Sequence, residues 1–152
     1  MTEFGAVHEA ATAEGHERPA GVDDATVEAV GKLTEALETV IQARGHLYAF
    51  HQTTGSADLQ LDKVVELLRT AGHRTLADRI STELIGRNVI SGRWTFQLVE
   101  EYDDNYYDLF TQLEKTARDQ LTGGRRHLAE AEMKQRRVTP GQQGHEIDPG
   151  EM

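Results

Sequence analysis

The sequence contains no cysteine among its 152 residues. This absence excludes disulfide bonds, a thiolate nucleophile, and any zinc or iron–sulfur site built on cysteine ligands. No serine stands beside a histidine in a spacing typical of a nucleophile and its base. The sequence therefore favours a protein that is not an enzyme and that uses no cofactor.

Long apolar runs are also absent. No stretch approaches the roughly 18 consecutive apolar residues of a membrane-spanning helix. The N-terminus has no basic segment followed by an apolar one, as a secretory signal would have. The formal net charge of −10 disfavours nucleic acid, anionic membranes and acidic partners for the molecule as a whole. We therefore expect a cytoplasmic protein without membrane contact.

Charge divides the chain into three regions. Residues 1–24 carry six acids and one base, with glycine, alanine and proline between them, so we expect a disordered acidic arm. Residues 25–122 carry fifteen acids, ten bases and nearly all the large apolar residues, and we expect them to form the folded helical domain. Residues 123–152 hold five acids and five bases, which predicts a basic short helix followed by a disordered tail rich in proline and glycine.

Apolar periodicity predicts four helices in the central region, so the expected fold class is all-α. A long helix from about residue 26 to 51 ends before TTGS, which we interpret as a turn. A short helix then runs to Gly72, and a second short helix begins near Arg74. The glycines of GRNVISGRW predict a kink or turn. The last long helix runs from residue 93 or 94 to 121, where Gly123–Gly124 ends it.

Short connections predict antiparallel packing, and hence an antiparallel bundle of long, short, short and long helices. The long helices would then project beyond the middle pair and expose apolar ends. If the GRNVISGRW segment were instead helical, the third element would become a rod of about 70 Å. Either arrangement needs a partner for its apolar surface, and a second copy of the chain supplies one by symmetry. We therefore expect a homodimer.

Polar residues on the apolar faces form the candidate site. His46 and His51 lie about 140° apart on a helix, so they cannot chelate one ion together. His46 falls on the solvent side. His51 shares the apolar stripe with Arg44, and a guanidinium removed from water needs acceptors. Together with the polar residues on or beside the stripes of the other helices, the predicted polar core layer or ligand pocket comprises Arg44, His51, Glu83, Arg87, Asp103 and Asn105.

This set of polar residues has two interpretations. It can be structural, fixing the register and the partner of the helices, with Glu83 and Arg87 paired one turn apart. Alternatively, it can line a ligand pocket in which Arg44 or Arg87 holds an anionic group. A mononuclear metal site that uses His51 and Asp103 is conceivable, although we expect no metal.

The acidic stretch EEYDDNYYD looks like a carboxylate cluster for two metal ions. On the helical wheel, however, Glu100, Asp104 and Asp108 point away from the apolar stripe, as on a solvated helix face. A ferritin-like di-metal centre also needs Glu-x-x-His on two helices, and the sequence contains no such motif. We therefore reject that centre. Helical spacing predicts a core or dimer interface for the aromatic residues Trp94, Tyr102, Tyr106 and Phe110.

The segment GGRRHLAEAEMKQRR carries two basic clusters. These cations can dock on the protein's own acidic surface, or they can form an arm for nucleic acid or for an acidic protein. The overall negative charge opposes the second interpretation. The residues concerned are Arg125, Arg126, Lys134, Arg136 and Arg137.

Three segments, ARGHLYAFHQ, GRNVISGRWTFQLVEEYDDNYYDLF and RRHLAEAEMKQRR, resemble those of an uncharacterised family of small bacterial helical proteins with no assigned activity. The resemblance covers about residues 25–145 and implies no catalytic residue. A weaker likeness to ferritin-like bundles rests on the helical outline and on FHQTTG, without the metal-binding pattern.

The sequence therefore leaves three hypotheses, of which we expect the first. The protein is a non-enzymatic helical bundle that acts through self-association and protein contacts. Alternatively, it is a bundle that binds a small ligand or metal with its polar layer. The third hypothesis is nucleic-acid contact through the basic C-terminal segment.

Overall fold

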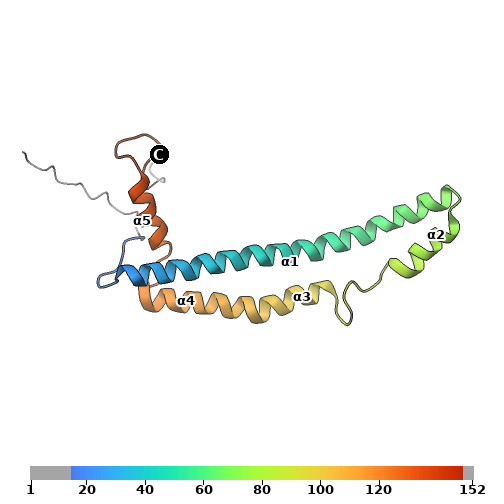
Figure 1. Ribbon diagram of the computed structural model, residues 1–152, viewed down its shortest axis with the longest axis horizontal. Coiled ribbons are helices and arrows are strands. Elements are labelled where there is room, and N and C mark those ends of the chain that lie inside the picture. Colours follow the sequence, from blue (N-terminus) through green and yellow to red (C-terminus); the bar gives the residue numbers. More distant parts are fainter. Residues whose placement is uncertain (1–14, 149–152) are drawn as a thin grey trace, which may run out of the picture. The chain divides into compact units, whose positions relative to one another are not determined.

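The computed structural model describes residues 15–148, which are mostly helical (Figure 1). Their only β pairing is an isolated bridge between Ile90 and Arg93. The chain divides into two compact units, one made of the residues up to Leu37 and from Thr111 onward, the other of Glu38–Phe110. In chain order the elements are α1 (Asp24–Thr70), α2 (Arg74–Arg79), η1 (Ile80–Leu84), α3 (Thr95–Glu101), η2 (Tyr102–Tyr107), α4 (Asp108–Thr122) and α5 (Leu128–Arg137), where η denotes a π-helical segment.

Helix α1 is one continuous helix, so the predicted turn at TTGS is wrong. The hydroxyl of Thr53 donates to the carbonyl of Ala49 at 2.6 Å, and that of Ser56 donates to the carbonyl of Gln52 at 3.0 Å. Both hydroxyls therefore bond back to their own helix instead of capping a new one. Gly55 weakens a helix by only about 1 kcal/mol relative to alanine, which the neighbouring turns tolerate.

The helix stops predicted at Gly72 and Gly123 are confirmed, and Gly86 lies where a kink or turn was predicted. Gly72 (φ +87°) follows α1, Gly86 (φ +74°) follows η1, and Gly123 (φ +62°) follows α4. Only glycine adopts this left-handed conformation without strain, which explains why these residues end helices. Residues 85–94 form a non-helical connection, as the GRNVISGRW segment predicted.

In the unit of residues 38–110, α1 contacts α3 and η2 through two side-chain pairs. Arg44 bonds Asp103, and His51 bonds Thr95. The earlier residue of α1 pairs with the later residue of the other segment, so the two run in opposite directions at these contacts.

In the other unit, a buried ion pair joins residues one turn apart on α4. Arg118 Nε donates to Glu114 Oε1 at 3.1 Å, and the two side chains are only 11% and 7% exposed. Thr34 on α1 also donates to Glu114 Oε1 at 3.0 Å. Helix α5 packs close to α1 at Gly31, where an added Cβ would lie 3.1 Å from the Cβ of Ala129.

The segment before α1 contacts α5 and the turn that precedes it. Arg18 donates to both carboxylate oxygens of Glu132, at 2.9 and 3.0 Å. His16 Nδ1 donates to the carbonyl of Arg126 at 2.6 Å. Residues 1–14 of the expected acidic arm lie outside the described residues, and the part that the structure describes is held by these contacts.

Candidate functional site

Arg44 and Asp103 form the best-defined polar contact in residues 38–110. Arg44 Nε and Nη2 donate to the two oxygens of Asp103 at 2.6 and 2.9 Å, a bidentate geometry. The guanidinium also lies 5.8 Å from the ring centre of Tyr48 and 5.5 Å from that of Tyr107. The hydrogen bonds from Arg44 lower the pKa of the Asp103 carboxyl, and those to Asp103 raise the pKa of Arg44.

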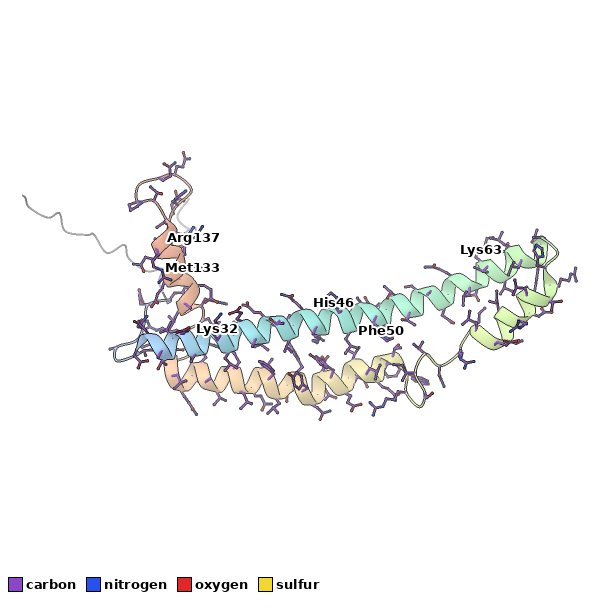
Figure 2. All side chains as sticks on the ribbon, viewed as in Figure 1. Lys32, His46, Phe50, Lys63, Met133 and Arg137 are labelled. Atoms are coloured by element: carbon purple, nitrogen blue, oxygen red, sulfur yellow. The ribbon has the colours of Figure 1, made fainter. Side chains whose placement is uncertain are left out.

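His51 contacts a residue that the sequence analysis did not identify. Its Nδ1 lies 2.8 Å from Thr95 Oγ1, and its ring lies edge-on to Tyr48 with 6.1 Å between centroids. Thr95 begins α3, so this contact fixes the start of that helix against α1. His51 and Asp103, the two residues of the conceivable mononuclear metal site, are thus engaged with different partners. His46 is exposed, as predicted (Figure 2).

The other predicted site residues do not join this contact. Glu83 accepts two hydrogen bonds from Arg79, at 2.9 and 3.1 Å, and these lower the pKa of its carboxyl. Asn105 donates to the carbonyl of Glu101 on its own helix at 3.0 Å. Glu83, Arg87 and Asn105 are all exposed, while Arg44 and Asp103 are 35% and 28% exposed.

The predicted polar core layer is therefore corrected to a half-buried pair, a separate histidine contact and three surface residues. The reason is that too few helices surround the polar face to remove it from water. Arg79 was missed because the order of Glu83 and Arg87, acid before base, is the more favourable one on a helix, whereas in the structure Glu83 pairs with Arg79 in the reverse order.

The acidic stretch and the aromatic residues near it lie largely at the surface. Glu100, Asp104 and Asp108 are exposed, as the helical wheel predicted. The rings of Tyr102, Tyr106 and Phe110 follow one another along the helix, with centroids 5.7 and 5.9 Å apart. Tyr106 is nevertheless 54% exposed, so this aromatic row is only partly covered by its own chain.

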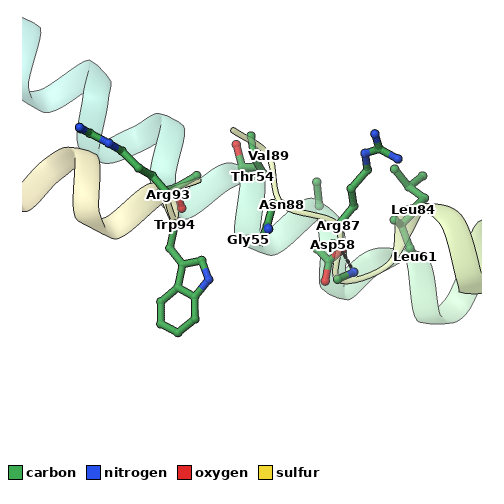
Figure 3. A pocket seen from close by; sticks show the side chains of 13 residues that line it. Thr54, Gly55, Asp58, Leu61, Leu84, Arg87, Asn88, Val89, Arg93 and Trp94 are labelled. Atoms are coloured by element: carbon green, nitrogen blue, oxygen red, sulfur yellow. Dashed lines mark hydrogen bonds between the residues drawn. The ribbon is translucent and has the colours of Figure 1, made fainter. Parts of the chain in front are cut away.

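A pocket of about 630 Å³ lies between residues 54–61 of α1 and residues 84–95 (Figure 3). The backbone N–H of Gly86 donates to Asp58 Oδ1 at 3.0 Å, which ties the two walls together. Arg87 and Trp94 both line it, at opposite ends of the connecting segment (Figure 3). Of the predicted site residues, only Arg87 lines this pocket.

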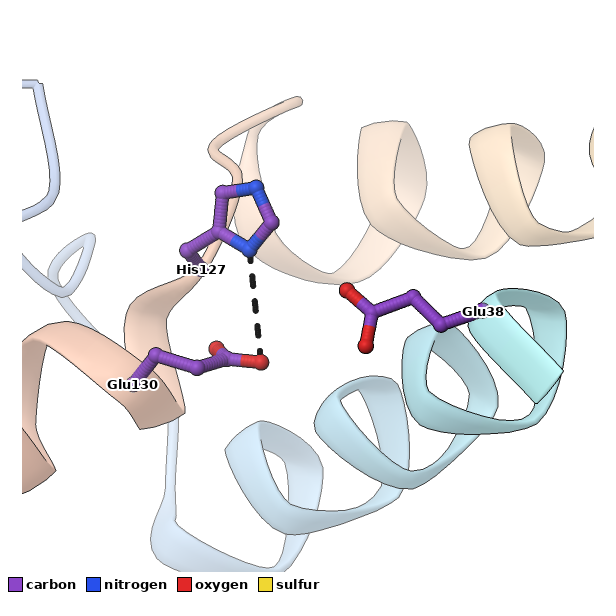
Figure 4. Close-up of side chains that lie close together, drawn as sticks. All are labelled: Glu38, His127 and Glu130. Atoms are coloured by element: carbon purple, nitrogen blue, oxygen red, sulfur yellow. Dashed lines mark ion pairs between the residues drawn. The ribbon is translucent and has the colours of Figure 1, made fainter. Parts of the chain in front are cut away.

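The basic segment is partly engaged with its own chain. Arg125 forms an ion pair with Glu17, and Arg18 pairs with Glu132 of α5. His127 Nδ1 lies 4.0 Å from Glu130 Oε1 (Figure 4). The cations Arg126, Lys134, Arg136 and Arg137 are exposed, the last of them near Met133 (Figure 2).

Within residues 15–148, no helix combines the length and the apolar character that a membrane crossing requires. Comparison with models of protein families, with curated proteins and with solved structures finds no match to this chain.

Proposed function

We propose that this protein is a cytoplasmic, non-enzymatic helical-bundle protein that acts through self-association, and that residues 38–110 supply the contact surface. In this proposal the helices of one chain form the antiparallel bundle predicted from the sequence, and a second copy covers the apolar surface that the bundle leaves exposed. A second copy supplies the same apolar faces by symmetry.

The supporting observation is the imbalance between exposed and buried apolar side chains. In residues 38–110, fourteen large apolar side chains are each at least 37% exposed, whereas the buried apolar residues are Val65, Ala77 and Val99. In the described part of the other unit, three are exposed and three are buried. Exposed apolar surface on this scale marks a contact surface.

The apolar area is sufficient for a stable interface. A large apolar side chain presents on the order of 150 Å² when fully exposed, so these side chains offer on the order of 1,000 Å². Each partner in a standard interface buries roughly 800 Å². Covering these side chains would therefore remove enough apolar surface from water to hold two chains together.

Charge favours a second copy over an unrelated partner. Residues 69–93 carry five arginines and two acids, whereas residues 95–110 carry five acids and no base. Some of these charged side chains form ion pairs within the chain. Among residues 15–148, however, the basic side chains of Arg74 and Arg87 and the acidic side chains of Glu100 and Asp104 form no ion pair. An antiparallel dimer can set the basic stretch of one copy against the acidic stretch of the other, which gives orientation as well as affinity.

Light scattering on the eluting full chain, over a wide range of concentrations, tests the proposal. We expect a mass of twice 16.9 kDa at high concentration, with dissociation favoured by dilution and by added salt. A mass that stays monomeric at every concentration would contradict self-association.

Three double variants locate the surface: Leu59→Glu with Leu67→Glu, Leu76→Glu with Leu84→Glu, and Tyr106→Glu with Leu109→Glu. At least one should weaken the dimer by a hundredfold or more, since each buries two new charges. The matched control is Gln42→Glu with Gln60→Glu, which adds the same charge at exposed polar positions of α1. A dimer that resists all three double variants would show that residues 38–110 are not the interface.

A further inference from the structure

The pocket between α1 and residues 84–95 has the size and lining of a small-molecule site. Its volume of about 630 Å³ lies within the roughly 300–1,000 Å³ typical of such sites. Leu61, Leu84 and Val89 form apolar parts of the wall. Gly55 is part of the wall, and a Cβ added there would meet no atom within 4 Å, so a larger side chain at this position would occupy open space.

The walls of the pocket are held in place by one hydrogen bond between them and by a backbone bridge within one wall. Gly86 donates its N–H to Asp58 on α1, and the bridge between Ile90 and Arg93 closes the turn within the opposite wall. The space is therefore formed before any ligand enters.

Arg87 is the polar group that distinguishes this pocket. Its guanidinium forms no hydrogen bond or ion pair with any of residues 15–148, and Glu83, whose carboxylate feels the charge of Arg87, is already held by Arg79. Arg93, the other arginine of the lining, is committed to an ion pair with Glu101. One oxygen of Asp58 accepts the N–H of Gly86, which partly compensates its charge.

We infer that this pocket binds an amphipathic monoanion, with its apolar body against Leu61, Leu84 and Val89 and its anionic head on Arg87. A carboxylate matches the planar fork of the guanidinium and accepts two hydrogen bonds from it. The inference does not depend on self-association, because all lining residues come from one chain.

Trp94 provides the readout, because it lines the pocket and is the single tryptophan of the sequence. Three probes of equal chain length are titrated into the full-length protein: octanoate, octylamine and octan-1-ol. We expect a saturable change in tryptophan fluorescence with octanoate, binding about tenfold weaker with octanol, and the weakest binding with octylamine. A preference for octylamine would assign the site to Asp58 and overturn the inference, as would the absence of saturation with octanoate.

Two substitutions separate the anionic head from the apolar body. Arg87→Leu should lower the affinity for octanoate about tenfold, to that for octanol, and should leave the affinity for octanol unchanged. The control is Arg74→Leu, because Arg74 is an exposed arginine of the same unit that lies outside the pocket. Gly55→Leu should abolish binding of all three probes. Its control is Gly45→Leu, on the same helix and also in open space but outside the pocket. Equal binding of octanoate to the Arg87→Leu and unaltered proteins would refute the role of Arg87.

The same fluorescence measurements also show whether a second copy of the chain, instead of a small molecule, occupies the pocket. Tryptophan fluorescence that changes on dilution of the protein alone, together with octanoate binding that weakens as protein concentration rises, would mean that self-association fills the pocket. That result would overturn the ligand assignment while supporting the proposed function. Loss of dimerisation in the Leu59 or Tyr106 double variant with intact octanoate binding would support both conclusions, because none of the residues replaced in these two variants lines the pocket.

Discussion

The buried pair of Glu114 and Arg118 gives a quantitative prediction for stability. The Glu114 carboxylate is held by Arg118 and by Thr34, and Arg118 also donates to the carbonyl of Gly124 at 3.2 Å. Removing one member of a buried pair leaves the other charge without its partner, which typically destabilises by 3–5 kcal/mol. Because the Gly124 carbonyl still accepts from Arg118, we place Glu114→Leu at the lower end, about 3 kcal/mol. Arg118→Leu should cost a similar amount.

The double variant, Glu114→Leu with Arg118→Leu, separates the stability that the ion pair contributes from the cost of leaving one buried charge without a partner. With both residues replaced by leucine, no buried charge remains, so the loss should be at most about 3 kcal/mol instead of the roughly 6 kcal/mol of two independent losses. Urea unfolding followed by circular dichroism measures all four proteins. Each single variant should also melt about 6–12 °C below the unaltered chain. Strictly additive losses would refute the reasoning, because they would mean that the two charges do not depend on each other.

Two further predictions concern the other polar contact and the course of α1. The pKa of Asp103 is lowered in the folded protein by its hydrogen bonds from Arg44, so its contribution to stability is present above the ordinary carboxyl pKa and is lost as pH falls through the lower folded value. The difference in unfolding free energy between the unaltered chain and Asp103→Asn should therefore shrink below about pH 4; a difference that persists undiminished at lower pH would contradict this linkage. Gly55→Ala should stabilise the protein by about 0.5–1 kcal/mol, because Gly55 is inside a helix with open space around it, whereas Gly72→Ala should destabilise it by about 1 kcal/mol because φ is positive there. Urea denaturation measures the unfolding free energy of both variants. If Gly55→Ala destabilised the protein and Gly72→Ala stabilised it, the prediction of a turn at TTGS would be correct after all.

The sequence predicted the helical class and most helix ends because these depend on local rules. Apolar periodicity marks a helix wherever it lies, and a glycine in the left-handed conformation ends one regardless of tertiary contacts. The predicted turn at TTGS is wrong because the local rule is ambiguous there. Serine and threonine stabilise either a cap or, by bonding back to the preceding turn, a helix interior, so their presence does not decide between the two.

The polar site was predicted only in part, for a geometric reason. Arg44 and Asp103 were both selected and do contact each other, since a guanidinium on an apolar stripe needs an acceptor. A wheel of 100° per residue, however, assumes a regular α-helix, and residues 80–84 and 102–107 are π-helical. The wider turns of a π-helix shift the face that later residues occupy. The pairing of His51 with Thr95 could not be found by this means, because it depends on where α3 begins.

The two segments that complicated the sequence analysis meet in the structure. TTGS and GRNVISGRW both interrupt the apolar pattern, and residues from both line the pocket of about 630 Å³. Glycines and small polar residues weaken helices, and sites where local preference conflicts with the fold are those where function is expected. Gly55 makes this conflict measurable, because the same position lies inside a helix and beside the pocket. If the pocket binds a ligand, Gly55→Ala should raise the free energy of unfolding, and Gly55→Leu should abolish octanoate binding. Side chains larger than that of glycine at this position would then increase stability but prevent binding. If Gly55→Leu binds octanoate as tightly as the unaltered chain, the small residue at this position has no role in binding.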